Sequence, residues 1–501
     1  MSKIKSLILG SAAVIAASAG AQAADLPVKA KAVQYVKICS LYGAGFYYIP
    51  GTDTCIKLGG YVQADYNINA GNYNKPAWDE GGFRANGTGS RDSDAYTTRA
   101  RVNFNVDTRT ATEYGVVRTY WSSNFEHSTG FGPSSGNLTM DYGFIQFAGF
   151  TLGKAVSSFQ TPWASYANNT SFLIGASDDL TGITQIAYTW QFGNGVSAQV
   201  SLEDNRVINR AQLINASASI TNANIFTGVY SNNYAGNQVP DIVGNIKVDQ
   251  AAFTAQVSAA AHQVNANYYY GAGTAPLNVE TNGHPDDKWG FAVTGGLQLK
   301  NLPTGAGDTL SLDATYANGA MKYLISGVTG TSFDHFSGNS ALGYNSFAAL
   351  ALADGVYTTG GGIDLTSGWG FRGVFNHNWS PTWQTSVFGS YTKIDYNGTA
   401  SANLCGMTAA TGATTGGTAV TRTGTCNPDF AIAQVGTRTA WTPVRNLTFS
   451  GEVLYSYLDQ NNSGTVTSLG ASNPVGFKPA GVYEYKDQGI WSGNLRVRRT
   501  F

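Results

Sequence analysis

The sequence has little charge and, after its first residues, no long apolar run. Only 12% of its 501 residues are charged, and the formal net charge is −1. A balance so close to zero gives no basic surface for nucleic acid and no acidic tail. After residue 23, no segment approaches the roughly 20 continuous apolar residues that a membrane-spanning helix needs. The composition therefore predicts neither a nucleic-acid-binding protein nor a helical membrane protein.

Cysteine and histidine are also scarce. The chain has four cysteines and five histidines, contains no C-x-x-C motif, and spaces no histidine with a cysteine as a zinc site would. We therefore expect no metal and no cofactor.

The four cysteines, Cys39, Cys55, Cys405 and Cys426, permit three disulfide pairings. We expect the pairs that are close in sequence, Cys39–Cys55 and Cys405–Cys426, because each closes a modest loop in a chain sent to an oxidising compartment. The other two pairings remain open from the sequence alone.

Two patterns resemble motifs of enzymes but do not support catalysis. Ser390 and Lys393 match S-x-x-K, but residues three apart on a strand point to opposite faces, so the lysine cannot serve the serine. Residues 149–154 are one residue short of a phosphate-binding loop and lack the Ser or Thr after the lysine. The sequence therefore predicts no catalytic residue.

Glycine and aromatic residues are abundant instead. The chain has 61 glycines and 28 tyrosines, and 12% of its residues are aromatic. The mean hydropathy is nevertheless only −0.14. This mixture is expected where apolar and polar residues alternate along strands.

The last eight residues, 494–501, show this alternation most clearly. Leu495, Val497 and Phe501 fall on one face of a strand, and Asn494, Arg496 and Arg498 fall on the other. Hydrocarbon offers no hydrogen-bond partners, so a sheet can cross a bilayer only as a closed barrel. A strand that is apolar outside, polar inside and ends on an aromatic residue is typical of outer-membrane barrels, with Phe501 as the terminal signature.

The N-terminus carries an export signal. Lys3 and Lys5 supply positive charge, residues 7–17 form a short apolar core, and residues 21–23 (AQA) form a small-residue cleavage site. The alternative, an uncleaved anchor, needs a longer core. We expect a signal peptide at 1–23, a periplasmic N-terminal segment at 24–55 and a barrel domain at 56–501.

The pattern of alternation and turns predicts an all-β fold, a 16-stranded antiparallel transmembrane β-barrel. The expected strands lie near 56–67, 95–107, 113–126, 138–147, 150–158, 181–192, 196–204, 241–248, 251–265, 287–300, 308–323, 368–379, 383–396, 430–441, 446–459 and 489–501. Seven short turns alternate with eight long loops, as sixteen antiparallel strands require when both chain termini lie on the same side of the membrane.

Three stretches are harder to assign from the sequence. Two further strands within 205–240 would give eighteen. The segments 324–367 and 397–429 are rich in Gly, Ala and Thr and are interpreted as external loops, in which 347–353 is a candidate short helix.

Both ends of the mature chain resemble a known family. Residues 37–61 (KICSLYGAGFYYIPGTDTCIKLGGY) resemble the opening of mature alphaproteobacterial porins, and 24–27 (ADLP) and 498–501 (RRTF) are similar to that family too. The resemblance implies a general-diffusion porin, a homotrimer in the cell outer membrane of a Gram-negative bacterium, with an inward-folded third loop. It implies as partners outer-membrane lipid, lipopolysaccharide, the barrel-assembly machinery, ions and small hydrophilic solutes. The insertions 324–367 and 397–429 and the second cysteine pair match no family pattern.

A pore of this kind selects by its width and by the charges at its narrowest point. The third long loop, 157–181, contains no Lys or Arg but carries Asp178 and Asp179. Its aromatic and apolar residues, among them Phe159, Trp163 and Ile174, are expected to pack against the wall.

Strand phase places Arg99, Arg101 and Arg118 in the lumen, facing that loop. Opposed basic and acidic rows would set a transverse field across the constriction. The alternative is that these arginines are ordinary lumen residues paired with Asp92, Asp94 or Asp107; other lumen candidates are Arg372, Arg438, Arg496 and Arg498.

The function expected from these features is passive diffusion of ions and small hydrophilic solutes through an aqueous channel. Two alternatives remain: a channel selective for a sugar or carboxylate, and a plugged barrel with a structural or adhesive role. The first would need a ladder of aromatic residues along the lumen, and the second would conduct no current.

Overall fold

The computed structural model describes residues 37–70, 94–130, 132, 134–163, 169, 173–177, 182–206, 211–217, 232–271, 278–325, 332–337, 346–409, 420–468 and 481–501. The expected signal peptide, 1–23, lies outside them. The chain forms two compact units, residues 1–56 and 57–501. Among the described residues, no helix has the length and hydropathy that crossing a membrane requires.

The described part of the first unit is a small stapled hairpin. A 3-10 turn, η1 (Ser40–Tyr42), precedes β1 (Tyr47–Tyr48), which pairs with Cys55 and Ile56 at the start of β2 (Thr54–Ile68). Cys39 and Cys55 form a disulfide and are both 1% exposed, packed with Phe46. The first predicted disulfide is thus confirmed.

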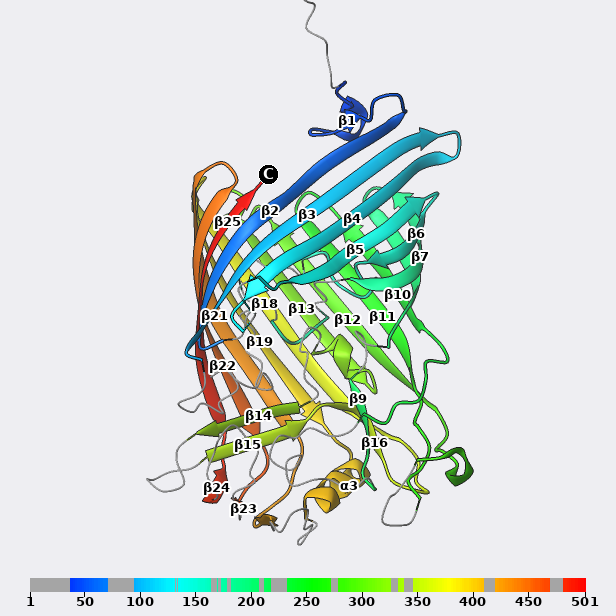
Figure 1. Ribbon diagram of the computed structural model, residues 1–501, viewed down its shortest axis with the longest axis vertical. Coiled ribbons are helices and arrows are strands. Elements are labelled where there is room, and N and C mark those ends of the chain that lie inside the picture. The colour runs from blue at the N-terminus through cyan, green and yellow to red at the C-terminus, as the bar shows by residue number, and fades with distance from the viewer. Residues whose placement is uncertain are drawn as a thin grey trace, which may run out of the picture. The chain divides into compact units, whose positions relative to one another are not determined.

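The second unit is a closed barrel of sixteen antiparallel strands (Figure 1). The strands are β2, β3 (Tyr96–Thr112), β4 (Gly115–Ser128), β5 (Asn137–Phe147), β6 (Phe150–Ala155), β7 (Ile183–Gly193), β8 (Val196–Glu203), β10 (Asp241–Asp249), β11 (Phe253–Val264), β12 (Lys288–Lys300), β13 (Thr309–Asn318), β18 (Ser367–Ser380), β19 (Trp383–Asp395), β21 (Phe430–Val444), β22 (Leu447–Gln460) and β25 (Gln488–Thr500). The last strand closes on the first, with Tyr66 opposite Leu495.

All sixteen predicted strands are confirmed, with ends that differ by a few residues. The stretch 205–240 adds no barrel strand, because β8 and β10 pair directly, Glu203 opposite Asp241. The count is therefore sixteen and not eighteen. Seven short connections lie at one end, here called the turn end, and the eight long ones lie at the other, the loop end.

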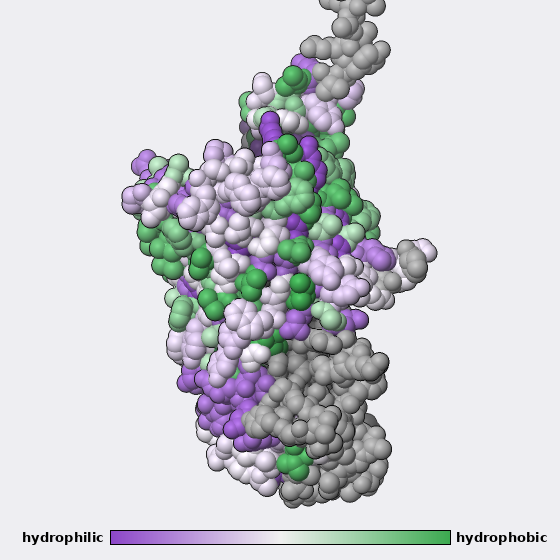
Figure 2. All heavy atoms as spheres, turned by 90° about the vertical axis from the view of Figure 1, so that its left-hand side faces the viewer, coloured by the Kyte–Doolittle hydropathy of each residue, from purple (hydrophilic) through white to green (hydrophobic). Residues whose placement is uncertain are grey.

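Side chains alternate across the wall as the strand period requires. On β25, Leu495 is 58% exposed on the outer face, whereas the neighbouring Asn494 is 1% exposed on the lumen face. Figure 2 shows one side of the molecule, with apolar and pale aromatic atoms over the wall and a hydrophilic group below, toward the loop end. An apolar exterior and a polar interior are the arrangement that a lipid-embedded barrel needs.

The turn between β7 and β8 shows why the short connections can be so tight. Asn194 and Gly195 both have positive φ, 49° and 75°, as a two-residue hairpin turn requires. A Cβ on Gly195 would lie 2.0 Å from the carbonyl oxygen of Asp249, so only glycine fits there.

The long loops carry structure of their own at the loop end. A parallel pair of β9 (Gln212–Asn215) and β16 (Ala353–Tyr357) is extended by β17 (Asp364–Leu365). A five-stranded sheet contains β14 (Ser332–Ser337), β15 (Ser346–Ala351), β24 (Gly481–Tyr485), β23 (Thr465–Ser468) and β20 (Val420–Arg422). Short helical turns are η3 (Glu280–Asn282) and η4 (Met321–Tyr323). The helix considered at 347–353 is wrong: residues 347–351 lie in β15, which pairs with β14, and Ala353 begins β16, which pairs with β9, so tertiary strand pairing overrides the local helix preference.

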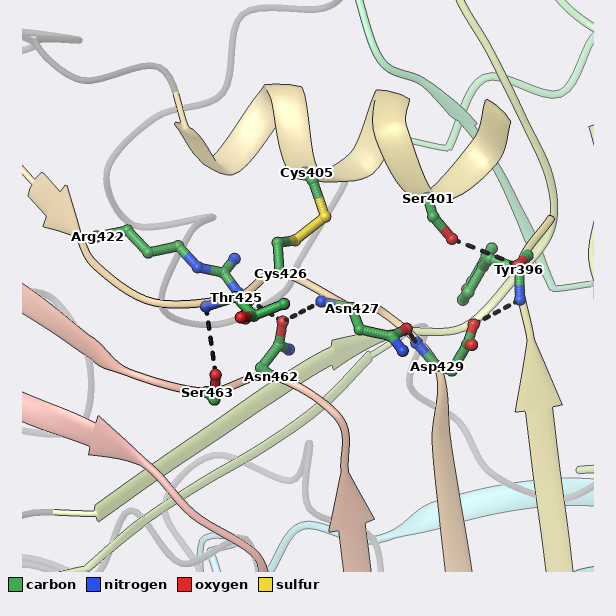
Figure 3. Close-up of a disulfide and its surroundings, with 10 residues drawn as sticks. All are labelled: Tyr396, Ser401, Cys405, Arg422, Thr425, Cys426, Asn427, Asp429, Asn462 and Ser463. Carbon is green, nitrogen blue, oxygen red and sulfur yellow. Dashed lines mark hydrogen bonds between the residues drawn. A yellow bond between two sulfur atoms is a disulfide. The ribbon is translucent and has the colours of Figure 1, made fainter. Parts of the chain in front are cut away.

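Within the described ranges there is one α-helix, α3 (Gly398–Ala409), which lies in the loop between β19 and β21. Its Cys405 forms a disulfide with Cys426, which confirms the second predicted pair (Figure 3). The segment after Cys426 is held in turn: the amide of Asn427 donates to Asn462 Oδ1 at 3.1 Å, and Asp429 Oδ1 accepts from the amide of Tyr396 at 2.7 Å.

Candidate functional site: the lumen wall and the third long loop

Arg99 lies on the lumen face of β3, as predicted, but it is 3% exposed and ion-paired. Its Nε and Nη2 donate to Asp65 Oδ2 on β2 at 2.9 and 2.7 Å. Asp65 is shared, because Arg496 Nε of β25 donates to its other oxygen at 2.6 Å. Arg99 is therefore part of a charge cluster on neighbouring strands, and its partner is none of the three aspartates considered from the sequence.

Arg101, two residues along β3, also faces the lumen. It pairs with Glu126 of β4, with Nη2 2.7 Å from Oε2, and its side chain is 14% exposed. Because it keeps some contact with solvent, Arg101 is better placed than Arg99 to act on a passing ion.

Arg118 pairs with Asp107, the one predicted partner that is observed. Its Nη2 lies 2.9 Å from Asp107 Oδ2, and its side chain is 28% exposed. Arg118 is eight residues along β4 from Glu126, which corresponds to about 27 Å of strand. The structure therefore does not bring Arg118 together with Arg99 and Arg101.

Two tyrosines on the lumen face lie beside arginines. The guanidinium of Arg118 is 5.3 Å from the ring centroid of Tyr120, and that of Arg498 is 4.4 Å from the ring of Tyr61. These contacts are cation–π interactions. They help to fix the orientation of the two guanidinium groups, whose positive charge an aromatic ring does not cancel.

The third long loop, between β6 and β7, begins on the wall of β8. Glu203 accepts hydrogen bonds from Ser157 Oγ and from the amide of Ser158, both at 2.8 Å. Asn245 of β10 donates to the carbonyl of Ser158 at 2.6 Å. All these wall residues have the lumen phase, so the loop starts along the inner face.

The middle of the loop is anchored on β13. Asp313 accepts from Trp163 Nε1 at 2.9 Å and from Thr161 Oγ1 at 3.3 Å. Trp163 packs with Val374, Phe388 and other buried apolar side chains of the wall. The expectation that aromatic residues of this loop pack against the wall is confirmed for Trp163. The ring of Phe159 instead contacts Tyr323 of η4, with centroids 4.5 Å apart and planes tilted by 53°.

Later residues of the loop reach strands on the other side of the ring. Asn169 accepts through its carbonyl from Arg496 Nη2 at 3.0 Å, and its amide donates to Glu452 of β22. Arg372 of β18 donates to the carbonyls of Leu173 and Ser177 at 3.1 and 2.9 Å. Arg372 is 1% exposed and paired with Asp313, so it anchors the loop and does not line a water path.

Gly175 allows the closest approach of loop and wall. Its φ is 113°, and a Cβ would lie 2.7 Å from the carbonyl oxygen of Phe371. Its amide donates to the carbonyl of Leu324 at 3.0 Å. The predicted acidic residues of the constriction, Asp178 and Asp179, lie outside the described residues.

The sequence analysis missed the acidic and amide residues that organise this site. Asp65, Glu203, Asp313 and Glu452 all have the lumen phase in predicted strands, and each binds an arginine or the loop. A search for inward carboxylates on every strand would have found them as a group. Their partners would have stayed unknown, since Asp65 and Arg496 are 431 residues apart in sequence.

The enzyme-like patterns have no catalytic geometry in the described residues. Ser390 is buried on the lumen face of β19, and Lys393 lies on the other face and pairs with Asp395. The pattern G-x-S-x-G also occurs, at 132–136, in the loop between β4 and β5. A nucleophile elbow needs a strand followed by a helix, and here a strand follows.

Comparison with known proteins identifies a family whose sequence pattern matches most of this chain. The model of the Porin subfamily matches residues 25–494. Porin Omp2b of Brucella suis is 36% identical over 211 residues, 40% of this chain and 52% of that protein, and Porin Omp2b of Brucella canis is 34% identical over 256 residues, 49% and 62% of the two chains. The chain thus spans little more than half the length of these relatives. The crystal structure of the outer membrane channel DcaP of Acinetobacter baumannii is similar in fold, with a TM-score of 0.57, 14% identity and coverage of 91% of this chain and 99% of that one.

Proposed function

Because the chain belongs to the porin family, whose model spans nearly all of it, we propose that it forms a passive aqueous channel for ions and small hydrophilic solutes. Family membership and the barrel fold place it in the outer membrane of a Gram-negative cell. The barrel replaces hydrocarbon by a polar path, and no chemical step is required.

The observation that carries this proposal is the opposite character of the two faces of one closed ring. Outward side chains such as Ile246 and Val257 are 61% and 60% exposed, while inward neighbours include ion pairs such as Arg101–Glu126. Charged side chains on the inner face of a barrel need water or each other. Arg118, on that face, keeps 28% of its side chain exposed to the water path that the proposal requires.

The constriction is part of the same proposal. The third loop folds into the lumen, and we assign its acidic side to Asp178 and Asp179, which lie outside the described residues. Arg101 is the most effective member of the basic side and Arg99 a weaker one, whereas Arg118 lies at a separate level of the lumen, about 27 Å along β4 from Glu126. The hydrogen bonds that described parts of the loop donate to Glu203 and Asp313 and accept from Arg372 and Arg496 support this path.

Further assignments rest partly on the family resemblance, which supports the assembly, and partly on the sequence, which supports the signal peptide and the lack of a catalytic set. The mature protein is a homotrimer, inserted by the barrel-assembly machinery and surrounded by lipid and lipopolysaccharide. Residues 1–23 are a cleaved signal peptide, 24–55 a periplasmic segment, and the chain has no catalytic activity.

Single-channel recording of refolded protein in a planar bilayer with asymmetric salt tests the proposal. We expect stepwise current with a measurable ion preference, and no steps from detergent alone or from protein that was not refolded. A correctly folded sample that gives no steps would contradict the channel. Block by one sugar or carboxylate would instead identify a selective channel.

A further inference from the structure

The loop end of the lumen holds a large apolar cluster, which an open aqueous pore does not need. Here strands β10 to β25 carry a set of inward apolar side chains that are at most 4% exposed; among them are Val243, Ala292, Ala317, Ile394, Ile432 and Leu458. On the same strands nearer the turn end, inward residues such as Ser311 and Gln434 are polar. The wall therefore changes character along its own length.

Residues of the long loops cover this apolar wall. One cluster unites the wall with Phe159, Met321, Leu324, Val356, Leu404 and Met407, all at most 8% exposed. These residues come from three loops, and those on α3 (Leu404, Met407 and also Ala400) share one helix face at spacings of three and four. Such burial removes apolar side chains from lumen water, which stabilises the packed state.

A buried carboxylate ties the loops together at this point. Asp354 is 0% exposed and accepts from the amide of Met321 at 2.7 Å, from the amide of Ala211 at 2.8 Å and from Tyr234 Oη at 2.8 Å. Its three donors lie on two different loops. Burial raises the pKa of Asp354, and the donated hydrogen bonds partly offset that effect.

The same network reaches the barrel wall through His262 of β11. His262 Nε2 is 3.1 Å from Tyr234 Oη, and His262 Nδ1 is 2.7 Å from Asp241 Oδ1 on β10. Tyr323 Oη donates to the other oxygen of Asp241 at 2.7 Å. Two loops and two strands thus meet in one buried polar cluster, beside the apolar one.

The disulfide described above holds the outer side of this assembly. Figure 3 shows Cys405 on α3 joined to Cys426, whose segment is bonded to the loop between β22 and β25 through Asn462 and Ser463. Cys405 directly follows Leu404, which faces the cluster. The helix is therefore fixed from one side by a covalent bond and from the other by packing.

We propose that α3, residues 320–325 and β16 form an apolar plug that closes the lumen mouth beside β10–β25, latched by Asp354, and confines permeants to the polar sector beside β2–β5. This inference deepens the proposed channel function. The plug stands on the contacts described above, whereas the route of the permeants rests on that function. In the polar sector the inward side chains near the loop end are polar: Asn67, Thr97 and Glu126 are buried and bonded to neighbouring wall residues, and Thr139 is partly exposed.

Thiol labelling of refolded full-length protein tests the plug directly. Ala317→Cys places a thiol under the plug, where Ala317 is 0% exposed, and Thr139→Cys places one on the half-exposed lumen face of β5. We expect a membrane-impermeant maleimide to label Thr139→Cys readily and Ala317→Cys very slowly. Equal labelling rates at the two positions would overturn the plug.

The latch is tested in the same assay. Asp354→Ala should raise the labelling rate of Ala317→Cys by roughly tenfold or more, because three buried hydrogen bonds to the loops are lost, and should raise the single-channel conductance. Asp286→Ala, which alters an exposed aspartate at the loop end, is the matched control and should change neither. Unchanged protection of Ala317→Cys in Asp354→Ala would exclude Asp354 as the latch.

Two further outcomes separate failure of the latch from failure of the channel proposal. If Asp354→Ala does not fold, Tyr234→Phe removes the hydroxyl that donates to Asp354 and should raise the same labelling rate by a smaller factor; no change would count against the latch. If the unmodified protein gives no current while Ala317→Cys stays protected, the channel proposal fails and the plug stands.

Discussion

The polar sector and the plugged sector are built from the same kind of strand but enclose different interiors. On β2 and β3 the lumen face is polar along its described length, with Asp65, Asn67, Arg99 and Arg101. On β21 the lumen face begins with Phe430 and Ile432, continues with Gln434 and reaches Arg438. Period-two alternation separates outside from inside, but it does not say whether water or protein fills the inside.

The two sectors also differ in what holds them. The polar sector depends on ion pairs between adjacent strands, which need no loop. The plugged sector depends on side chains that arrive from loops far away in sequence. We therefore expect that changes in the loops will affect the plugged sector first and leave the polar ion pairs in place.

The largest effect should follow from Trp163→Ala. Trp163 is 6% exposed, packs among wall residues of the plugged sector and donates to Asp313. Truncating a buried tryptophan costs about 3–5 kcal/mol, enough to free this part of the third loop from the wall. Single-channel conductance and current noise should both rise. Trp190→Ala, on the outer face at 44% exposure, is the control; equal effects of the two would show that the loop anchor is not what narrows the pore.

The next largest effect should come from the disulfides, because the pair Cys405–Cys426 links α3 of the plug to the segment that follows it. Replacing both Cys405 and Cys426 by Ser removes a link that closes a loop with a sequence separation of 21, worth about 3 kcal/mol in the loop-entropy account. We expect noisier current and faster labelling of Ala317→Cys. The matched variant lacks Cys39 and Cys55, separated by 16 residues. If it loosened Ala317 as much, the second disulfide would have no special part in the plug.

The strands were predictable because lipid imposes one period on every crossing. Sixteen strands, seven turns and both cysteine pairs follow from residues that are close in sequence. The phase alone also placed Arg99, Arg101 and Arg118 on the lumen face. The pair Arg118–Asp107 was among the partners considered from the sequence. The partners of Arg99 and Arg101 were not predictable, because Asp65 and Glu126 lie on neighbouring strands and neither strand's sequence determines the register between them.

The plug could not be predicted for a related reason. The run Phe430-Ala-Ile-Ala433 is apolar on both faces, and such a run indicates burial on both faces of a sheet. This signal could have shown that the lumen is not wet at that height. The covering residues, such as Val356 and Leu404, lie in segments of Gly, Ala and Thr with no regular period, so nothing in the sequence links them to this wall.

A smaller effect is expected from the arginines of the polar sector. Replacing Arg99 and Arg101 together by Ser should raise conductance and shift selectivity toward cations, since Glu126 then loses its partner. A unit charge about 8 Å from a permeating ion in water changes its energy by about 0.5 kcal/mol, roughly a twofold change in permeability. Arg101→Ser alone should give most of the shift, because Arg99 has only 2% of its side chain exposed and Asp65 keeps Arg496.

Reversal potentials in a salt gradient measure that shift. Arg118→Ser is the informative comparison, because Arg118 is more exposed but lies far along β4. A larger shift from Arg118 than from Arg101 would move the selective point toward the turn end. No shift from any of the three would remove them all from the selectivity of the pore.

The smallest effect should be a loss of stability in acid at the turn end of the plugged sector. Asp308, in the turn before β13, accepts from Thr304 Oγ1 and His377 Nδ1 at 2.6 Å each and from the amide of Asn378 at 2.9 Å. Burial opposes ionisation, but these donors prevail and lower the pKa of Asp308 to about 2. The ordinary value is about 3.9, so the stabilisation is complete above about pH 4 and is lost as the pH falls toward 2.

Asp354 at the loop end has the opposite sign, and this contrast makes the acid experiment specific. Its pKa is raised by burial, so protonation relieves a cost of folding there instead of removing a stabilising contribution. Urea unfolding in detergent should therefore show Asp308→Asn less stable than the native protein at pH 5, with the difference shrinking by pH 2.5. Asp249→Asn, at the exposed end of β10, should show a smaller difference at both pH values, because its ion pair with Lys300 is screened by water. A gap between Asp308→Asn and the native protein that stayed constant down to pH 2.5 would mean that the charge of Asp308 is not what joins this turn to β18.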